Sequence, residues 1–204
     1  SDLIMECVDP HFGFSRYAER LSRSANSFDE LYDALHEGHT YIDNILTSIL
    51  AARMADVQPD MVAISVPFPG NLYAAFRCGQ WIKKHYPQVK IAMGGGFPNT
   101  ELRSLSDTRV FEFIDFITLD DGEAPMENLV QFINGRKTVE ELKRTFLLQE
   151  GKVTYINNPS CHDYKQGQVG TPDYSDLLLD RYISAIEVVN PMHSLWSDGR
   201  WNKL

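Results

Sequence analysis

Short apolar runs alternate with longer stretches in which apolar residues recur every three or four positions. Four runs have the length and continuous apolar character of buried parallel strands: 3–9, 61–68, 89–93 and 113–119. Three stretches that follow these runs have the composition and spacing of helices: 71–87, a short one near 99–106, and 123–134. The pattern therefore predicts strands and helices in regular alternation.

The clearest helical periodicity starts at Thr40. Its apolar residues follow the i, i+3, i+4, i+7 rule: Ile42, Ile45, Leu46, Ile49, Leu50 and Met54. We expect this apolar face to lie on the sheet. Pro59 ends the helix, because proline disfavours helical geometry in the residue before it.

Alternating strands and helices predict right-handed crossovers and a mainly parallel sheet that is covered on both faces. The fold class is then α/β, a three-layer sandwich of the Rossmann or flavodoxin-like type. Residues 144–148 and 152–156 flank Glu150-Gly151, which is typical of a hairpin with a two-residue turn. This hairpin should add antiparallel strands at the sheet edge.

From Asn157 onward the chain is rich in Pro, Gly, Asp and aromatic residues and shows little periodicity. We expect an α/β domain over residues 1–156 and an irregular linker or arm over residues 157–204.

The charge and cysteine content narrow the possible partners. A formal net charge of −9 without a cluster of Lys and Arg argues against nucleic acid and against an anionic membrane surface. No apolar stretch approaches the roughly 20 residues of a membrane span, so a cytoplasmic location is predicted. The three cysteines are too scattered for a disulfide framework or a structural zinc site. The expected partners are small molecules or proteins.

The loops that follow the predicted strands carry the candidate site, because ligands of open parallel sheets bind beyond the carboxyl ends of the strands. Glycine lets a bulky ligand approach the backbone, and hydroxyl and amide side chains offer hydrogen bonds. The candidate residues in these loops are Ser65, Pro67, Phe68, Gly70, Asn71, Gly94, Gly95, Gly96, Phe97, Thr118, Gly122 and Glu123.

Other interpretations of these loops stay open. The glycines do not fit a phosphate cradle, because no Lys-Ser or Lys-Thr follows them and G-x-G-x-x-G is not met. They could instead let the strand pass close to a helix. Glu123 suggests a general acid and Asp120-Asp121 a metal ligand, yet carboxylates at a helix N-terminus also serve as caps.

The stretch 62–130 resembles the cobalamin-binding-type domain of radical SAM proteins, in the group of magnesium-protoporphyrin IX monomethyl ester oxidative cyclases. The shared marks are a strand with a serine, a helix ending near K..P, a strand ending in Gly-Gly, and an acidic Gly-Glu turn. In that family a Ser-x-Leu element precedes Gly-Gly by 26 to 28 residues. Here Ser65-Val66-Pro67 precedes Gly95-Gly96 by 27 residues, and Pro67 replaces the leucine.

The resemblance implies a cobalamin cofactor. It implies that Ser65 and Gly94 to Gly96 line the cavity for the dimethylbenzimidazole tail, with Phe68, Gly70 and Asn71 nearby. The family's lower cobalt ligand is the histidine of D-x-H-x-x-G. The candidate here is His11 in Asp9-Pro10-His11-Phe12-Gly13, which is one residue short of that motif and far upstream of Ser65. A loop histidine without a metal is the alternative.

The CxxxCxxC loop that holds the iron-sulfur cluster of radical SAM enzymes does not occur in this sequence. The resemblance therefore implies an excised N-terminal domain that is not catalytic on its own and whose N-terminus is also truncated. Its partner would be a C-terminal radical SAM barrel of the parent chain, which would hold the cluster and SAM. The alternatives are a scaffold or substrate-shelf domain that has lost cobalamin, and a small-ligand or nucleotide-sensing module.

Overall fold

The computed structural model describes residues 7, 28–171, 173 and 175. The chain divides into two compact units, Ser1–Tyr164 and Lys165–Leu204. Of the predicted strand 3–9 only Cys7 is described, and it is helical rather than extended; His11 lies outside the described residues. None of the described helices combines the length and the apolar content that crossing a bilayer requires.

The first unit alternates helices and strands, as the sequence pattern predicts. Its helices are α2 (Asp29–His36), α3 (Tyr41–Val57), α4 (Leu72–His85), α5 (Gly96–Glu101) and α6 (Glu123–Ile133). Its strands are β1 (Met61–Ser65), β2 (Lys90–Gly94), β3 (Phe116–Thr118), β4 (Thr145–Gln149) and β5 (Lys152–Ile156). Short 3-10 turns are η2 (Pro69–Asn71), η3 (Thr108–Glu112) and η4 (Val139–Glu141). The second unit includes the short helix α7 (Gln166–Val169).

The five strands form one open mixed sheet in the order β1-β2-β3-β4-β5. β1, β2 and β3 are parallel, and β4 and β5 continue the sheet in antiparallel pairing. The predicted edge hairpin is confirmed, since Gln149 pairs with Lys152 across Glu150-Gly151. Both turn residues have positive φ, 49° and 73°, which is the geometry of a type I′ turn. The fold class α/β is therefore established.

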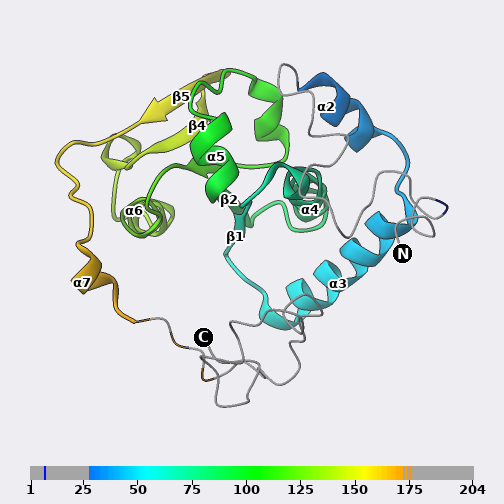
Figure 1. Ribbon diagram of the computed structural model, residues 1–204, viewed down its shortest axis with the longest axis horizontal. Coiled ribbons are helices and arrows are strands. Elements are labelled where there is room, and N and C mark those ends of the chain that lie inside the picture. The colour runs from blue at the N-terminus through cyan, green and yellow to red at the C-terminus, as the bar shows by residue number, and fades with distance from the viewer. Residues whose placement is uncertain (1–6, 8–27, 172, 174, 176–204) are drawn as a thin grey trace, which may run out of the picture. The chain divides into compact units, whose positions relative to one another are not determined.

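Helices cover both faces of the sheet, and Figure 1 shows α4 and α6 on opposite sides of it. The first face is the one on which α4 packs, and its core includes Ile91, Met93 and Ile117. The second face is the one on which α6 packs, and its core includes Ala92 and Phe116. Alternate residues of β2 and β3 thus contribute to different cores, as strand geometry requires.

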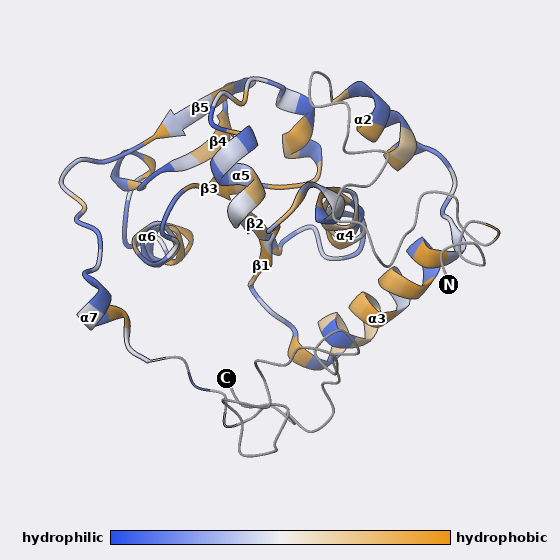
Figure 2. Ribbon diagram, in the orientation of Figure 1, coloured by the Kyte–Doolittle hydropathy of each residue, from blue (hydrophilic) through white to orange (hydrophobic). Residues whose placement is uncertain are grey.

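The helix predicted from Thr40 forms as α3, and Leu50 and Met54 of its predicted face pack in the core, but the rest of the prediction about its buried face is wrong. Ile45 and Ile49 are 42% and 61% exposed, whereas Asp43 and Thr47 are buried. The helix packs against α4. The apolar residues of α3 lie on several of its sides, as its colouring in Figure 2 shows, so periodicity alone could not identify the buried side.

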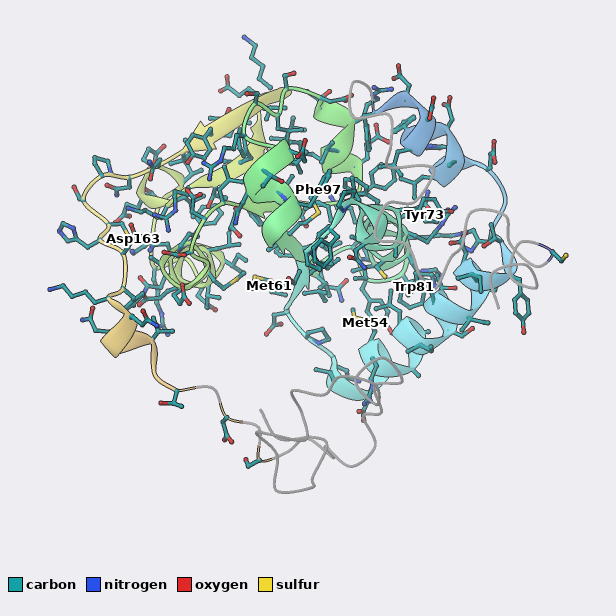
Figure 3. The ribbon with its side chains drawn as sticks, viewed as in Figure 1. Met54, Met61, Tyr73, Trp81, Phe97 and Asp163 are labelled. Atoms are coloured by element: carbon teal, nitrogen blue, oxygen red, sulfur yellow. The ribbon has the colours of Figure 1, made fainter. Side chains whose placement is uncertain are left out.

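A buried ion pair determines which side of α3 faces inward. Asp43 of α3 and Arg77 of α4 lie 3.1 Å apart, and their side chains are 2% and 1% exposed. Arg77 also donates hydrogen bonds to the carbonyls of Ala34 and Leu35 at the end of α2. Tyr73 donates to Asp43 at 2.9 Å, and burial raises the pKa of Tyr73 to about 12. This network joins α2, α3 and α4, and Figure 3 marks Tyr73 within it.

Candidate functional site

The loops that follow β1 and β2 lie side by side at one end of the sheet. Ser65 is in register with Gly94, and both residues end their strands. The Val66 amide donates to the Gly94 carbonyl at 2.7 Å, and the Phe97 amide donates to the Val66 carbonyl at 3.0 Å. The expectation that the Ser65 loop and the glycines share one end of the sheet is confirmed.

The space beside Gly95 and Gly96 is filled by the protein's own backbone. A Cβ on Gly95, where φ is +106°, would lie 2.9 Å from the Val66 amide nitrogen and carbonyl oxygen. A Cβ on Gly96 would lie 2.7 Å from the Pro67 carbonyl oxygen. The expectation that these two glycines leave an open slot is wrong, because they allow the two loops to touch.

Gly94 and Thr118 are in contact on the second face of the sheet. A Cβ on Gly94 would lie 2.9 Å from the Thr118 hydroxyl oxygen. Thr118 is only 4% exposed and lies in register with the fully buried Thr145 of β4. The second face therefore carries a glycine and two threonines at the adjoining ends of β2, β3 and β4, beside the candidate site.

The open part of the site lies on β1. Met61 packs into the core beneath α6, so Ala63 and Ser65 belong to that same second face by strand alternation. Both Ala63 and Ser65 are exposed. We call the exposed surface of Ala63 and Ser65 the β1 patch. It is a bare strip of sheet at the carboxyl end of a parallel strand, which is where α/β proteins bind ligands.

Residues after β1 add apolar surface near the β1 patch. Pro67 is exposed, and Phe68 is 47% exposed although it is aromatic. Gly70 and Asn71 belong to η2, which leads into α4. Phe97, by contrast, is 9% exposed and belongs to the core of the first face, so little of its side chain is available to contact a ligand.

The acidic loop after β3 is held by arginines. Asp120 has a φ of 60° and forms ion pairs with Arg103 and Arg144. Its amide donates to Asn99 at 2.6 Å, which joins this loop to α5. Within residues 28–171 and the other described positions, no group of three or more His, Cys, Asp or Glu side chains is arranged to hold a metal ion.

Gly122 and Glu123 lie where the sequence places them, at the start of α6. Gly122 is the N-cap residue and Glu123 is in the first turn, and both are exposed. A carboxylate in this position interacts favourably with the positive end of the helix dipole, which accounts for Glu123 without catalysis.

Sequence reasoning missed two buried cations beside this loop. Lys143 and Arg144 immediately precede β4, and each is 8% exposed. Asp163 pairs with both of them, and its hydrogen bond from Arg144 lowers the pKa of the Asp163 carboxyl. The sequence signal that could have identified them is a Lys-Arg pair next to a buried apolar strand, because charged residues are uncommon in such a position.

Comparison of the chain with protein-family models, curated proteins and solved structures finds no match in any of the three.

Proposed function

We propose that this chain is a cobalamin-binding-type domain of a radical SAM protein of the oxidative-cyclase group, and that it is not catalytic on its own. The observation that carries the proposal is the β1 patch, where Ala63 and Ser65 are exposed on a sheet face beside α6. The proposal assigns a Rossmann-like or flavodoxin-like topology to the open mixed sheet. A radical SAM barrel would be the partner and would hold the iron-sulfur cluster and SAM.

The chemistry of the site suits a large organic cofactor. Ala63 and Ser65 offer a flat surface of small side chains, and Ser65 adds a hydroxyl for hydrogen bonding. Phe68, which is nearly half exposed, supplies an aromatic surface for a ring system. Bound cobalamin would supply alkyl-transfer or redox chemistry, whereas these residues would only bind and orient its tail.

A scaffold or substrate-shelf domain without cofactor is the second candidate. The packing of Gly95 and Gly96 against Val66 and Pro67 favours it, because loop contact alone explains those glycines. The two candidates therefore differ on whether the β1 patch binds a ligand.

Gel filtration after mixing the protein with hydroxocobalamin separates the candidates. The wild-type protein fraction should retain corrin absorbance. Ser65→Leu should weaken hydroxocobalamin binding about tenfold, equivalent to ~1.4 kcal/mol, and so lower the retained absorbance, because the larger side chain covers the β1 patch. Gly95→Leu is a poor test, since its side chain would collide with the Val66 backbone and disturb the fold.

Ser48→Leu is the matched control, because Ser48 is an exposed serine on α3. It should retain as much corrin as the wild type, and both variants should keep the wild-type circular dichroism spectrum. A colourless wild-type fraction would overturn the cofactor proposal in favour of the scaffold.

A further inference from the structure

Two buried cations converge on a single carboxylate at the carboxyl end of the sheet. Arg144 Nη1 lies 2.6 Å from Asp163 Oδ1, and Lys143 Nζ lies 3.8 Å from Asp163 Oδ2. The side chains of Lys143 and Arg144 are each 10% exposed, whereas that of Asp163 is 46% exposed. The cations belong to the buried part of the domain, and the carboxylate belongs to its surface.

Asp163 lies on a segment that docks onto the domain, and we call residues 158–164 the strap. The Asn158 amide donates to the Leu142 carbonyl at 2.9 Å, and Asn128 of α6 donates to Cys161 Sγ at 2.9 Å. Lys143 Nζ donates to the Cys161 carbonyl at 2.5 Å. In these contacts the strap offers an amide, a thiol and a carbonyl, none of which is charged. Its negative charge reaches the two cations through Asp163.

The carboxylates near the two cations do not fully balance the positive charge. The Arg144 guanidinium also donates to the carbonyl oxygens of Leu119 and Asp121, at 3.2 and 2.9 Å. Asp120 lies 3.7 Å from Arg144 Nε but also pairs with Arg103. A buried cation loses hydration free energy, which close negative charge and hydrogen bonds to carbonyl oxygens restore in part. Lys143, Arg144 and Arg103 thus share two carboxylates, Asp120 and Asp163, which leaves a local excess of one positive charge in a chain whose net charge is −9.

The location of this pair also fits a binding site. Thr145, which follows Arg144, is in register with Thr118 at the carboxyl end of β3. Arg144 and Asp120 both have positive φ, 42° and 60°, a conformation that non-glycine residues adopt at a cost. The backbone thus places the Arg144 guanidinium at one end of the sheet. Open α/β folds bind their ligands at this same end.

We propose that Lys143 and Arg144 form a binding site for a small oxyanion and that the Asp163 carboxylate of the strap occupies it. A free oxyanion and Asp163 compete for the same hydrogen-bond donors. Binding of the oxyanion releases the strap, and docking of the strap closes the site. This proposal does not depend on whether the β1 patch binds cobalamin.

Calorimetric titration with inorganic phosphate, at an ionic strength held constant with sodium chloride, tests the competition. Asp163→Asn should bind phosphate about tenfold more tightly than the wild type, because a tethered carboxylate competes at millimolar or higher effective concentration. Adding Arg144→Gln to Asp163→Asn should abolish that gain. A parallel titration with acetate shows whether the site prefers phosphate or carboxylate.

Asp56→Asn is the matched control, because it removes the same charge from an exposed ion pair on α3. An equal gain in Asp56→Asn, or no phosphate binding by Asp163→Asn, would overturn the proposal. Hydrogen exchange of the wild type supplies a second measurement that needs no variant. Phosphate should speed exchange of the strap amides relative to chloride at equal ionic strength, and unchanged exchange would also refute the competition.

Discussion

Replacement of Arg77 by alanine should lower the free energy of unfolding by about 3–5 kcal/mol, as when one partner of a buried ion pair is removed. The variant leaves the Asp43 carboxylate, which is 2% exposed, without its cation. It also removes the hydrogen bonds from Arg77 to the carbonyls of Ala34 and Leu35, which weakens the attachment of α2 to α4. Urea denaturation followed by circular dichroism measures the change.

The matched control is Arg103→Ala, because Arg103 also forms an ion pair with an aspartate but its side chain is 52% exposed. Exposed pairs contribute about 0–1 kcal/mol, so this variant should be nearly as stable as the wild type. A second variant, Arg77→Met with Asp43→Leu, removes both charges and should recover much of the stability lost in Arg77→Ala. Equal stabilities of Arg77→Ala and Arg103→Ala would contradict this account of the ion pair.

Replacement of Gly79 by alanine should destabilise the protein by about 3 kcal/mol, the cost of forcing extra volume into a packed core. Helix propensity alone predicts the opposite, because alanine is favoured over glycine within a helix by about 1 kcal/mol. Gly79 lies in α4, and a Cβ there would be 2.3 Å from the Phe113 carbonyl oxygen. The backbone of α4 thus approaches the chain before β3 so closely that only glycine fits.

Gly38→Ala is the control for this variant, since no atom beyond the adjacent residues lies within 4 Å of the Cβ position at Gly38. It should match the wild type or slightly exceed it, because alanine restricts the unfolded chain. Thermal unfolding of the two alanine variants gives the comparison. A Gly79→Ala variant as stable as Gly38→Ala would show that α4 is not in such close contact.

The sequence predicted those elements whose pattern is local. β1, β2 and β3 were expected from continuous apolar runs, and the hairpin was expected from Glu150-Gly151. The buried face of α3 was not predicted, because it depends on the pairing of Asp43 with Arg77, 34 positions away. A helix that is apolar on several sides carries no local signal for such a choice.

The site shows the same division between local and distant information. Parallel strands end at the same side of a sheet, so the proximity of Ser65 and Gly94 followed from the pattern. The contact of Gly95 with Val66 depends on how closely two loops approach, which no spacing rule specifies. The pairing of Asp163 with Lys143 and Arg144 was equally hidden, because the irregular sequence after Asn157 gives no indication of where the strap docks.

The proposed function requires the β1 patch to bind a corrin cofactor. Chemical-shift mapping by nitrogen-15 NMR, with hydroxocobalamin added in excess, tests it most directly because it reports both binding and position. We expect shifts concentrated at the amides of Ala63, Ser65 and Phe68, with α3 unaffected. Unchanged spectra, or shifts confined to α2 and α3, would contradict it.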